Sequence, residues 1–177
     1  MAQPLQRADT ANRDAYPWPW TGYSNHPTEM PLAGYAALLG AYAGIFGTLF
    51  RTLWSRRDGA ESVSIRDALV LGVATHKIGR IVTKDWVTSP IRAPFTEYQK
   101  STGGGEVAER SRGEGLQRAT GDLLTCQWCI APWVAGGLYA TFLWKPAAAR
   151  FIAAAATSVA VSDFLQHAYS GTRRLSQ

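Results

Sequence analysis

Histidine and cysteine, which supply most metal ligands and many catalytic groups in proteins, are scarce in this sequence. Its 177 residues contain three histidines and two cysteines. The histidines are scattered, and the chain has neither a His-Glu-x-x-His zinc motif nor a serine nucleophile elbow with Asp and His partners. Gly103-Gly104-Gly105 lacks the Lys-Ser/Thr of a phosphate-binding loop. These absences disfavour an enzyme while leaving the question open, and we predict no cofactor.

Charged residues are also missing from the stretches Met30–Phe50 and Leu123–Trp144. As a helix, the first stretch is about 31 Å long, which is enough to cross the hydrocarbon layer of a membrane. The Ala-rich stretch Phe151–Tyr169 gives a third predicted membrane helix. A long polar tail precedes the first stretch, whereas a signal peptide has a short basic start, so we expect a retained anchor.

The net charge of +5 comes from Lys and Arg residues that lie beside the apolar stretches. No nucleic-acid recognition module accompanies them, and a membrane protein carries basic residues at these places to fix its orientation. We therefore expect membrane lipid and other membrane protein subunits, or a second copy of this chain, as partners, and no nucleic acid.

Ser64–Val82 is predicted to form an amphipathic helix. Ser64 is a suitable N-cap, and Asp67 stands where a capping box needs its acidic partner. Only Ala68–Thr75 is cleanly apolar, which is too short for an easy membrane crossing.

The distribution of Lys and Arg favours three spans over four. If 64–82 does not cross, one side carries fourteen basic residues and the other carries four. If it crosses, and Lys77 and Arg80 within it are left out, the same orientation puts six on the cytoplasmic side and ten outside. Because basic residues concentrate in the cytoplasm, we expect three spans, with the 83–122 loop and the C-terminus cytoplasmic. Four spans stay open, since long loops cross with weak regard to charge.

Two polar segments lie outside the predicted helices. In 83–122, Ser89-Pro90 and Ala93-Pro94 predict extended or turn backbone, and the triple glycine at 103–105 predicts a flexible loop. In the N-terminal tail, Trp18 and Trp20 stand in a Tyr-Pro-Trp-Pro-Trp cluster. Tryptophans of this kind either anchor the chain at the membrane interface or dock a partner protein, and both interpretations stay open.

Several short motifs occur in an order that resembles a known family. They are 74–85 (ATHKIGRIVTKD), 90–95 (PIRAPF), 113–115 (GEG), 124–129 (LTCQWC) with Trp133, and 162–164 (SDF). Through them the segment from Val63 to Tyr169 resembles the bacterial DUF1360 family. The resemblance implies a bacterial membrane protein, and it implies no catalytic role. Together with the predicted spans, it leads us to expect a multi-pass protein of the bacterial inner membrane.

Cys126 and Cys129 form a Cys-x-x-Cys motif at a predicted helix start. Two thiols at this spacing reach one another or one metal ion, and a helix N-terminus favours the reactive thiolate. No thioredoxin-like strand pattern surrounds them, and zinc needs four ligands, so a zinc site requires thiols pooled between two chains or a recruited histidine. Simple packing, metal binding and redox chemistry all stay open.

Four ionisable residues form a possible intramembrane polar cluster: His76, Arg80, Asp163 and His167. His76 and Arg80 share a helix face, as do Asp163 and His167. Ionisable groups at membrane depth are usually paired, so we expect Asp163 to lie against Arg80 or His76. The alternative is a role in handling protons or ions.

Together these patterns predict an all-α membrane protein with three spans, an amphipathic helix and a polar loop. We divide it into a polar tail (1–29), a transmembrane anchor (30–50), a DUF1360-like membrane domain (63–169) and a basic tail (170–177). The predicted function is a non-enzymatic accessory or scaffold subunit of a bacterial membrane complex. The alternative is a thiol-redox or metal-binding membrane protein that uses Cys126 and Cys129.

Overall fold

The computed structural model describes residues 16, 18–21, 23, 28–55 and 62–175. These residues form helices and one β-hairpin: α1 (Leu32–Ser55), α2 (Ile65–Lys84), η1 (Trp86–Thr88), α3 (Ser89–Arg92), β1 (Thr96–Gly103), β2 (Glu106–Ser111), α4 (Gly115–Thr125), α5 (Gln127–Trp144) and α6 (Pro146–Leu175).

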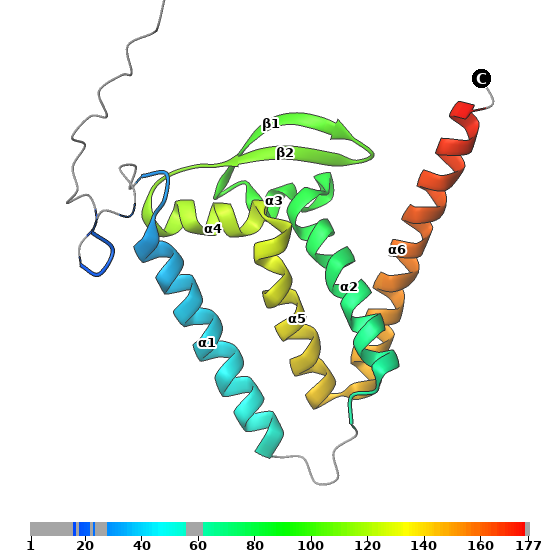
Figure 1. Ribbon diagram of the computed structural model, residues 1–177, viewed down its shortest axis with the longest axis horizontal. Coiled ribbons are helices and arrows are strands. Elements are labelled where there is room, and N and C mark those ends of the chain that lie inside the picture. The colour runs from blue at the N-terminus through cyan, green and yellow to red at the C-terminus, as the bar shows by residue number, and fades with distance from the viewer. Residues whose placement is uncertain (1–15, 17, 22, 24–27, 56–61, 176–177) are drawn as a thin grey trace, which may run out of the picture.

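The four long helices run in alternating directions (Figure 1). The β-hairpin, α4, the start of α1 and the C-terminal end of α6 lie at one end of the molecule, which we call the hairpin end. The end of α1, the start of α2 and the junction between α5 and α6 lie at the opposite end. Helix α6 diverges from α2 towards the hairpin end.

Helices α2, α5 and α6 share one apolar core. Its buried members are Leu71, Ala74, Leu138, Phe142, Ala149 and Ala153. The predicted capping box at the start of α2 is confirmed: the Ser64 hydroxyl accepts from the Asp67 amide, and the Asp67 carboxylate accepts from the Ser64 amide. The same carboxylate accepts two hydrogen bonds from Arg150, at 2.8 and 3.1 Å, so it also joins α2 to α6.

Helix α1 packs against α4 and α5 along one side only. A Cβ atom on Gly34 would lie 2.8 Å from the Cβ atom of Ala119, so glycine is needed for α4 to approach. The Phe46 ring fills the space where Gly136 of α5 lacks a side chain. Elsewhere α1 is open, and only 11% of its most apolar stretch is buried. A helix of a water-soluble core would be mostly buried, so this exposure favours lipid as its surroundings.

The prediction of an all-α protein with a polar loop is wrong in one region. Residues Thr96–Gly103 and Glu106–Ser111 form a two-stranded antiparallel sheet. The triple glycine is no flexible loop: Gly103 ends β1, and Gly104 and Gly105 form the turn with the positive φ that tight hairpin turns require. Ser89-Pro90 is helical, since a proline is tolerated in the first turn of a helix.

The predicted spans are reproduced in part. Among the described helices, α1 and α6 are long and apolar enough to cross a membrane. The expected continuous helix Leu123–Trp144 is broken at Cys126, where α4 ends and α5 begins. Three spans are therefore not confirmed. Helix α2 packs along α5 and α6.

Candidate functional site

A cavity of about 750 Å³ opens at the hairpin end between α2, α6 and the turn of the hairpin. All four residues of the predicted polar cluster line it: His76 and Arg80 from α2, and Asp163 and His167 from α6. Each pair lies on one face of its helix, as the spacing predicts. The packing of α2 against α6 brings the two faces together.

The carboxylate of Asp163 pairs with Lys77 rather than with Arg80 or His76. The Lys77 ammonium donates to Asp163 Oδ2 at 2.6 Å. The Lys77 side chain is only 11% exposed, whereas that of Asp163 is 40% exposed and faces the cavity. This ion pair joins α2 to α6.

Arg80 forms a second ion pair, with Glu106 at the start of β2. The hairpin turn folds back over the end of α2 and brings Glu106 within reach. Two hydrogen bonds hold it there: the Trp86 amide donates to the Gly105 carbonyl and the Trp86 indole donates to the Glu106 carbonyl, both at 3.0 Å. The cavity therefore has one wall from each of three elements far apart in the sequence.

The two histidines of the cluster differ in their contacts. His76 Nδ1 lies 3.0 Å from Nε2 of Gln127, which stands between the two cysteines of the Cys-x-x-Cys motif. His167 is exposed on the cavity wall formed by α6. The polar cluster and the cysteine motif are thus neighbours at the hairpin end.

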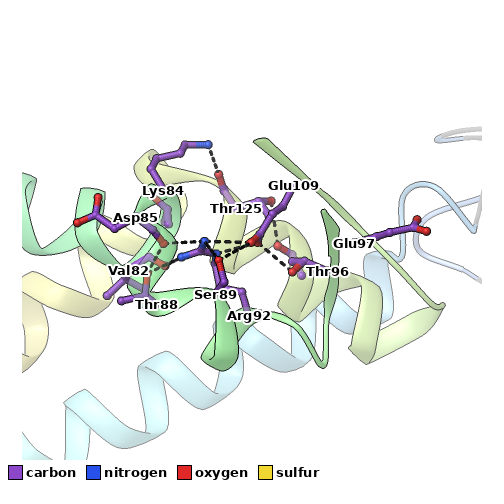
Figure 2. Close-up of polar contacts among 12 residues, drawn as sticks. Val82, Lys84, Asp85, Thr88, Ser89, Arg92, Thr96, Glu97, Glu109 and Thr125 are labelled. Atoms are coloured by element: carbon purple, nitrogen blue, oxygen red, sulfur yellow. Dashed lines mark hydrogen bonds and ion pairs between the residues drawn. The ribbon is translucent and has the colours of Figure 1, made fainter. Parts of the chain in front are cut away.

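The hairpin is fastened to α2 by Arg92 (Figure 2). This side chain is fully buried and donates to both oxygens of Glu109, at 2.7 and 3.0 Å. It also donates to the carbonyls of Val82 and Asp85 at the end of α2, at 2.8 and 3.0 Å. Arg92 donates further hydrogen bonds to the hydroxyls of Thr88 and Ser89, so each guanidinium nitrogen has at least one acceptor.

The carboxylate of Glu109 is almost as deeply buried, with 5% of its side chain exposed. Burial by itself favours the neutral acid, but hydrogen bonds from Arg92 and Thr96 together with the Arg92 charge outweigh it and hold the pKa of Glu109 below its ordinary value. Because these groups are saturated and enclosed, this network positions the hairpin and has no free group for chemistry.

Cys126 and Cys129 form a disulfide bond. Cys126 is the N-cap of α5, and its sulfur accepts from the Cys129 amide at 3.2 Å. The Lys84 ammonium donates to the carbonyl of the preceding residue, Thr125, at 2.9 Å. Within the part of the chain that the structure describes, no three His, Cys, Asp or Glu residues gather to hold a metal ion. Pooling of thiols between two chains stays a prediction.

The two tryptophans of the N-terminal tail have different surroundings. Trp18 is 88% exposed, whereas Trp20 is half-buried. The neighbouring Tyr16 is buried and donates to the Met30 carbonyl at 2.7 Å, which ties this part of the tail to the start of α1. Most of the tail lies outside the described residues, so its role as a docking peptide stays a prediction.

Sequence reasoning found Arg80 and Asp163 but missed their ion-pair partners, Glu106 and Lys77, and it missed the Arg92–Glu109 pair entirely. Lys77 stands three residues after Ala74 and six after Leu71, on the apolar face of α2, and a charge on such a face signals a buried partner. Arg92 stands between two prolines, but its glutamate partner is seventeen residues away. No local pattern connects them.

The family model with the description "Protein of unknown function (DUF1360)" matches residues 70–169, which is more than half of the chain. The chain belongs to the DUF1360 family. The matched region does not include α1, and neither does the resemblance predicted from the sequence. A relative of this DUF1360 protein is the sporulation protein YjcA of Bacillus subtilis (strain 168), with 29% identity over 87 residues, or 48% of this chain and 74% of the relative. No solved structure matches.

The four residues of the predicted polar cluster, Lys77, Glu106 and the two cysteines all fall inside the DUF1360 match. The two cations of the cavity, Lys77 and Arg80, are each paired with a carboxylate. These pairs hold α6 and the hairpin against α2, so their geometry supports a positioning role. The exposed histidine of α6 and the cysteine pair are the reactive groups near the cavity that these ion pairs do not use.

Proposed function

We propose that this protein is a non-enzymatic accessory subunit of a bacterial membrane complex and that it binds a helix of a partner membrane protein through α1. The supporting observation is the open face of α1. Among the residues that the structure describes, Gly40, Gly44 and Gly47 have no atom within contact distance of where a side chain would begin. All three are therefore unused in the contacts that α1 makes with the other described residues.

Helical geometry places this glycine face opposite the internal contacts of α1. At 100° per residue, Tyr42 and Phe46 each lie about 160° around the helix from Gly44. Tyr42 and Phe46 face inward, where both rings meet Trp133 of α5, at centroid distances of 5.3 and 6.1 Å. Gly44 thus points away from the bundle.

Glycines on the outer face of a membrane helix favour contact with another helix. Within a bilayer, apolar side chains gain little by leaving lipid, so helices associate through close packing of small residues. Large apolar side chains would serve equally well against lipid alone. The partner of α1 is accordingly a transmembrane helix with a matching apolar face.

The Bacillus relative is named as a sporulation protein, which is compatible with an accessory role here. The exposed Trp18 beside the start of α1 offers a second contact for the same partner. The paired charges of the candidate site then serve to hold the fold on which these surfaces are displayed.

We further propose that all four long helices cross the membrane, with both termini in the cytoplasm. The alternating directions of α1, α2, α5 and α6 support this arrangement (Figure 1). By sequence, ten Lys and Arg residues then belong to the side of the hairpin and termini (7, 13, 84, 92, 100, 110, 112, 118, 173 and 174) and six to the other side (51, 56, 57, 66, 145 and 150). The positive-inside tendency places the larger group in the cytoplasm.

Reporter fusions distinguish this topology from three spans. Green fluorescent protein fused to either terminus is expected to fluoresce, because it folds in the cytoplasm and not after export through the general secretion route. Alkaline phosphatase inserted between residues 55 and 62 is expected to be active, since it requires export. Three spans predict the opposite result for the N-terminal fusion and for the phosphatase insertion, so a non-fluorescent N-terminal fusion or an inactive phosphatase would contradict our proposal.

The substitution Gly44→Leu tests the docking face. We expect it to weaken association with the partner at least about tenfold, which corresponds to about 1.4 kcal/mol, because a leucine side chain keeps the two helix backbones apart. The measurement is the yield of a stoichiometric membrane protein that copurifies from native membranes in mild detergent.

The matched control is Gly72→Leu on α2, where the glycine also has open space. This control is expected to retain the partner. Wild-type protein that is repeatedly purified alone and monomeric would refute the accessory function.

A further inference from the structure

We infer that Cys126 and Cys129 form a redox-active cystine that accepts two electrons from a dithiol partner. The inference is independent of the docking face on α1. It starts from the disulfide itself, which closes a loop with only Gln127 and Trp128 between the two cysteines. The stabilisation that a disulfide gives grows with the length of the loop it closes, so this bond does less for stability than almost any other would.

The segment is also held in place without the disulfide. The first turn of α5 packs on α2, where Gly79 allows Ile130 to approach to within 3.5 Å of the position of a Cβ atom. The Gln127 side chain contacts His76, and the Thr125 carbonyl accepts from Lys84. Stabilisation of the fold therefore does not explain why the chain has these two cysteines.

Access to the disulfide is one-sided. Cys129 is exposed, Cys126 is half-buried, and the Trp128 ring between them is 88% exposed. An incoming thiolate therefore reaches the sulfur of Cys129 more easily than that of Cys126. The exposed indole offers an apolar surface on which a partner chain can rest beside the reacting sulfur.

The surroundings of Cys126 suit a leaving thiolate. It is the N-cap of α5, its sulfur already accepts the Cys129 amide, and the helix dipole stabilises negative charge at this position. Lys84 adds a positive charge beside Thr125, the preceding residue. A thiolate whose negative charge is stabilised in this way leaves more readily in disulfide exchange.

These features define the order of steps. A thiolate of the partner attacks Cys129 Sγ, the bond between the two cysteines breaks, and the electron pair goes to Cys126 Sγ. The second thiolate of the partner then attacks the partner sulfur of the mixed disulfide and releases Cys129. The partner is oxidised to its disulfide, Cys126 and Cys129 are reduced, and the two protons of the partner thiols end on the two cysteines.

The test uses the full chain in lipid nanodiscs with dithiothreitol and glutathione as probes. In mixtures of reduced and oxidised dithiothreitol, alkylation and mass spectrometry should show both thiols appearing together in one reversible transition. With reduced glutathione and acid quenching, the mixed disulfide should form on Cys129 with at least about tenfold preference over Cys126. A disulfide that stays closed in the folded protein, or glutathione on Cys126, would overturn the inference.

A double variant, Cys126→Ser with Cys129→Ser, excludes a structural role. Its melting temperature should fall by less than about 4 °C, because little loop entropy is lost. A larger fall would mean that the disulfide holds the fold, and the inference would be wrong.

Discussion

Replacement of Arg92 by alanine is expected to lower the free energy of unfolding by about 3–5 kcal/mol, since removing one partner of a buried ion pair leaves the other charge uncompensated. The stranded group is Glu109, which is 5% exposed and has its charge stabilised chiefly by Arg92. The substitution also removes the hydrogen bonds that Arg92 donates to the carbonyls of Val82 and Asp85. The measurement is denaturant unfolding in detergent micelles, with hydrogen exchange of β2 to locate the loss.

Arg112→Ala is the matched control for this experiment. Arg112 belongs to the same region, is exposed, and donates to the Pro94 carbonyl at 3.3 Å. Its loss should change stability by no more than about 0.5 kcal/mol. If the two variants behave alike, the enclosed network of Figure 2 does not hold the hairpin to α2.

The second large effect is expected from Asp163→Asn. Loss of the carboxylate charge leaves the Lys77 ammonium, which is 11% exposed, without its ion-pair partner. We expect a loss of about 1.5–3 kcal/mol, the range for a hydrogen bond between charged groups, because Asp163 itself is partly exposed. The readout is the melting temperature of the protein in nanodiscs.

A double variant distinguishes structure from proton or ion handling. Lys77→Met with Asp163→Leu removes both charges, and apolar replacements of a buried pair are often neutral for stability, so folding should return towards that of the wild type. If Asp163→Asn instead keeps its full stability and loses a cellular phenotype, the pair acts in ion or proton handling and the positioning role proposed here is wrong.

Local patterns predicted the parts of this fold that depend on neighbours in sequence. The capping box at Ser64 and Asp67 was readable because both partners lie within one helical turn. The same holds for the apolar length of α1, although its end at Ser55 exceeds the predicted Phe50. Four of the ionisable residues that line the cavity, His76, Arg80, Asp163 and His167, were found because each pair is spaced by one turn.

The hairpin escaped prediction for a physical reason. β1 has seven exposed residues after Thr96, so it shows no alternation of apolar and polar side chains. Its pairing with β2 is fixed instead by the glycine turn and by Glu109. This residue belongs to β2, and its buried carboxylate accepts a hydrogen bond from Thr96 of β1. A strand without an apolar face gives no periodic signal.

Some features were determined by the sequence alone: long apolar helices, a capped start of α2, a cysteine pair at a helix start and membership of the DUF1360 family. The tertiary structure alone decided that Lys77 rather than Arg80 meets Asp163, that Arg92 closes on Glu109, and that the glycines of α1 face outward. Helix formation and capping are local and leave a periodic trace in the chain. Ion pairs and helix faces depend on which surfaces meet after the chain has folded, and residues 17 to 86 positions apart carry no local mark of each other.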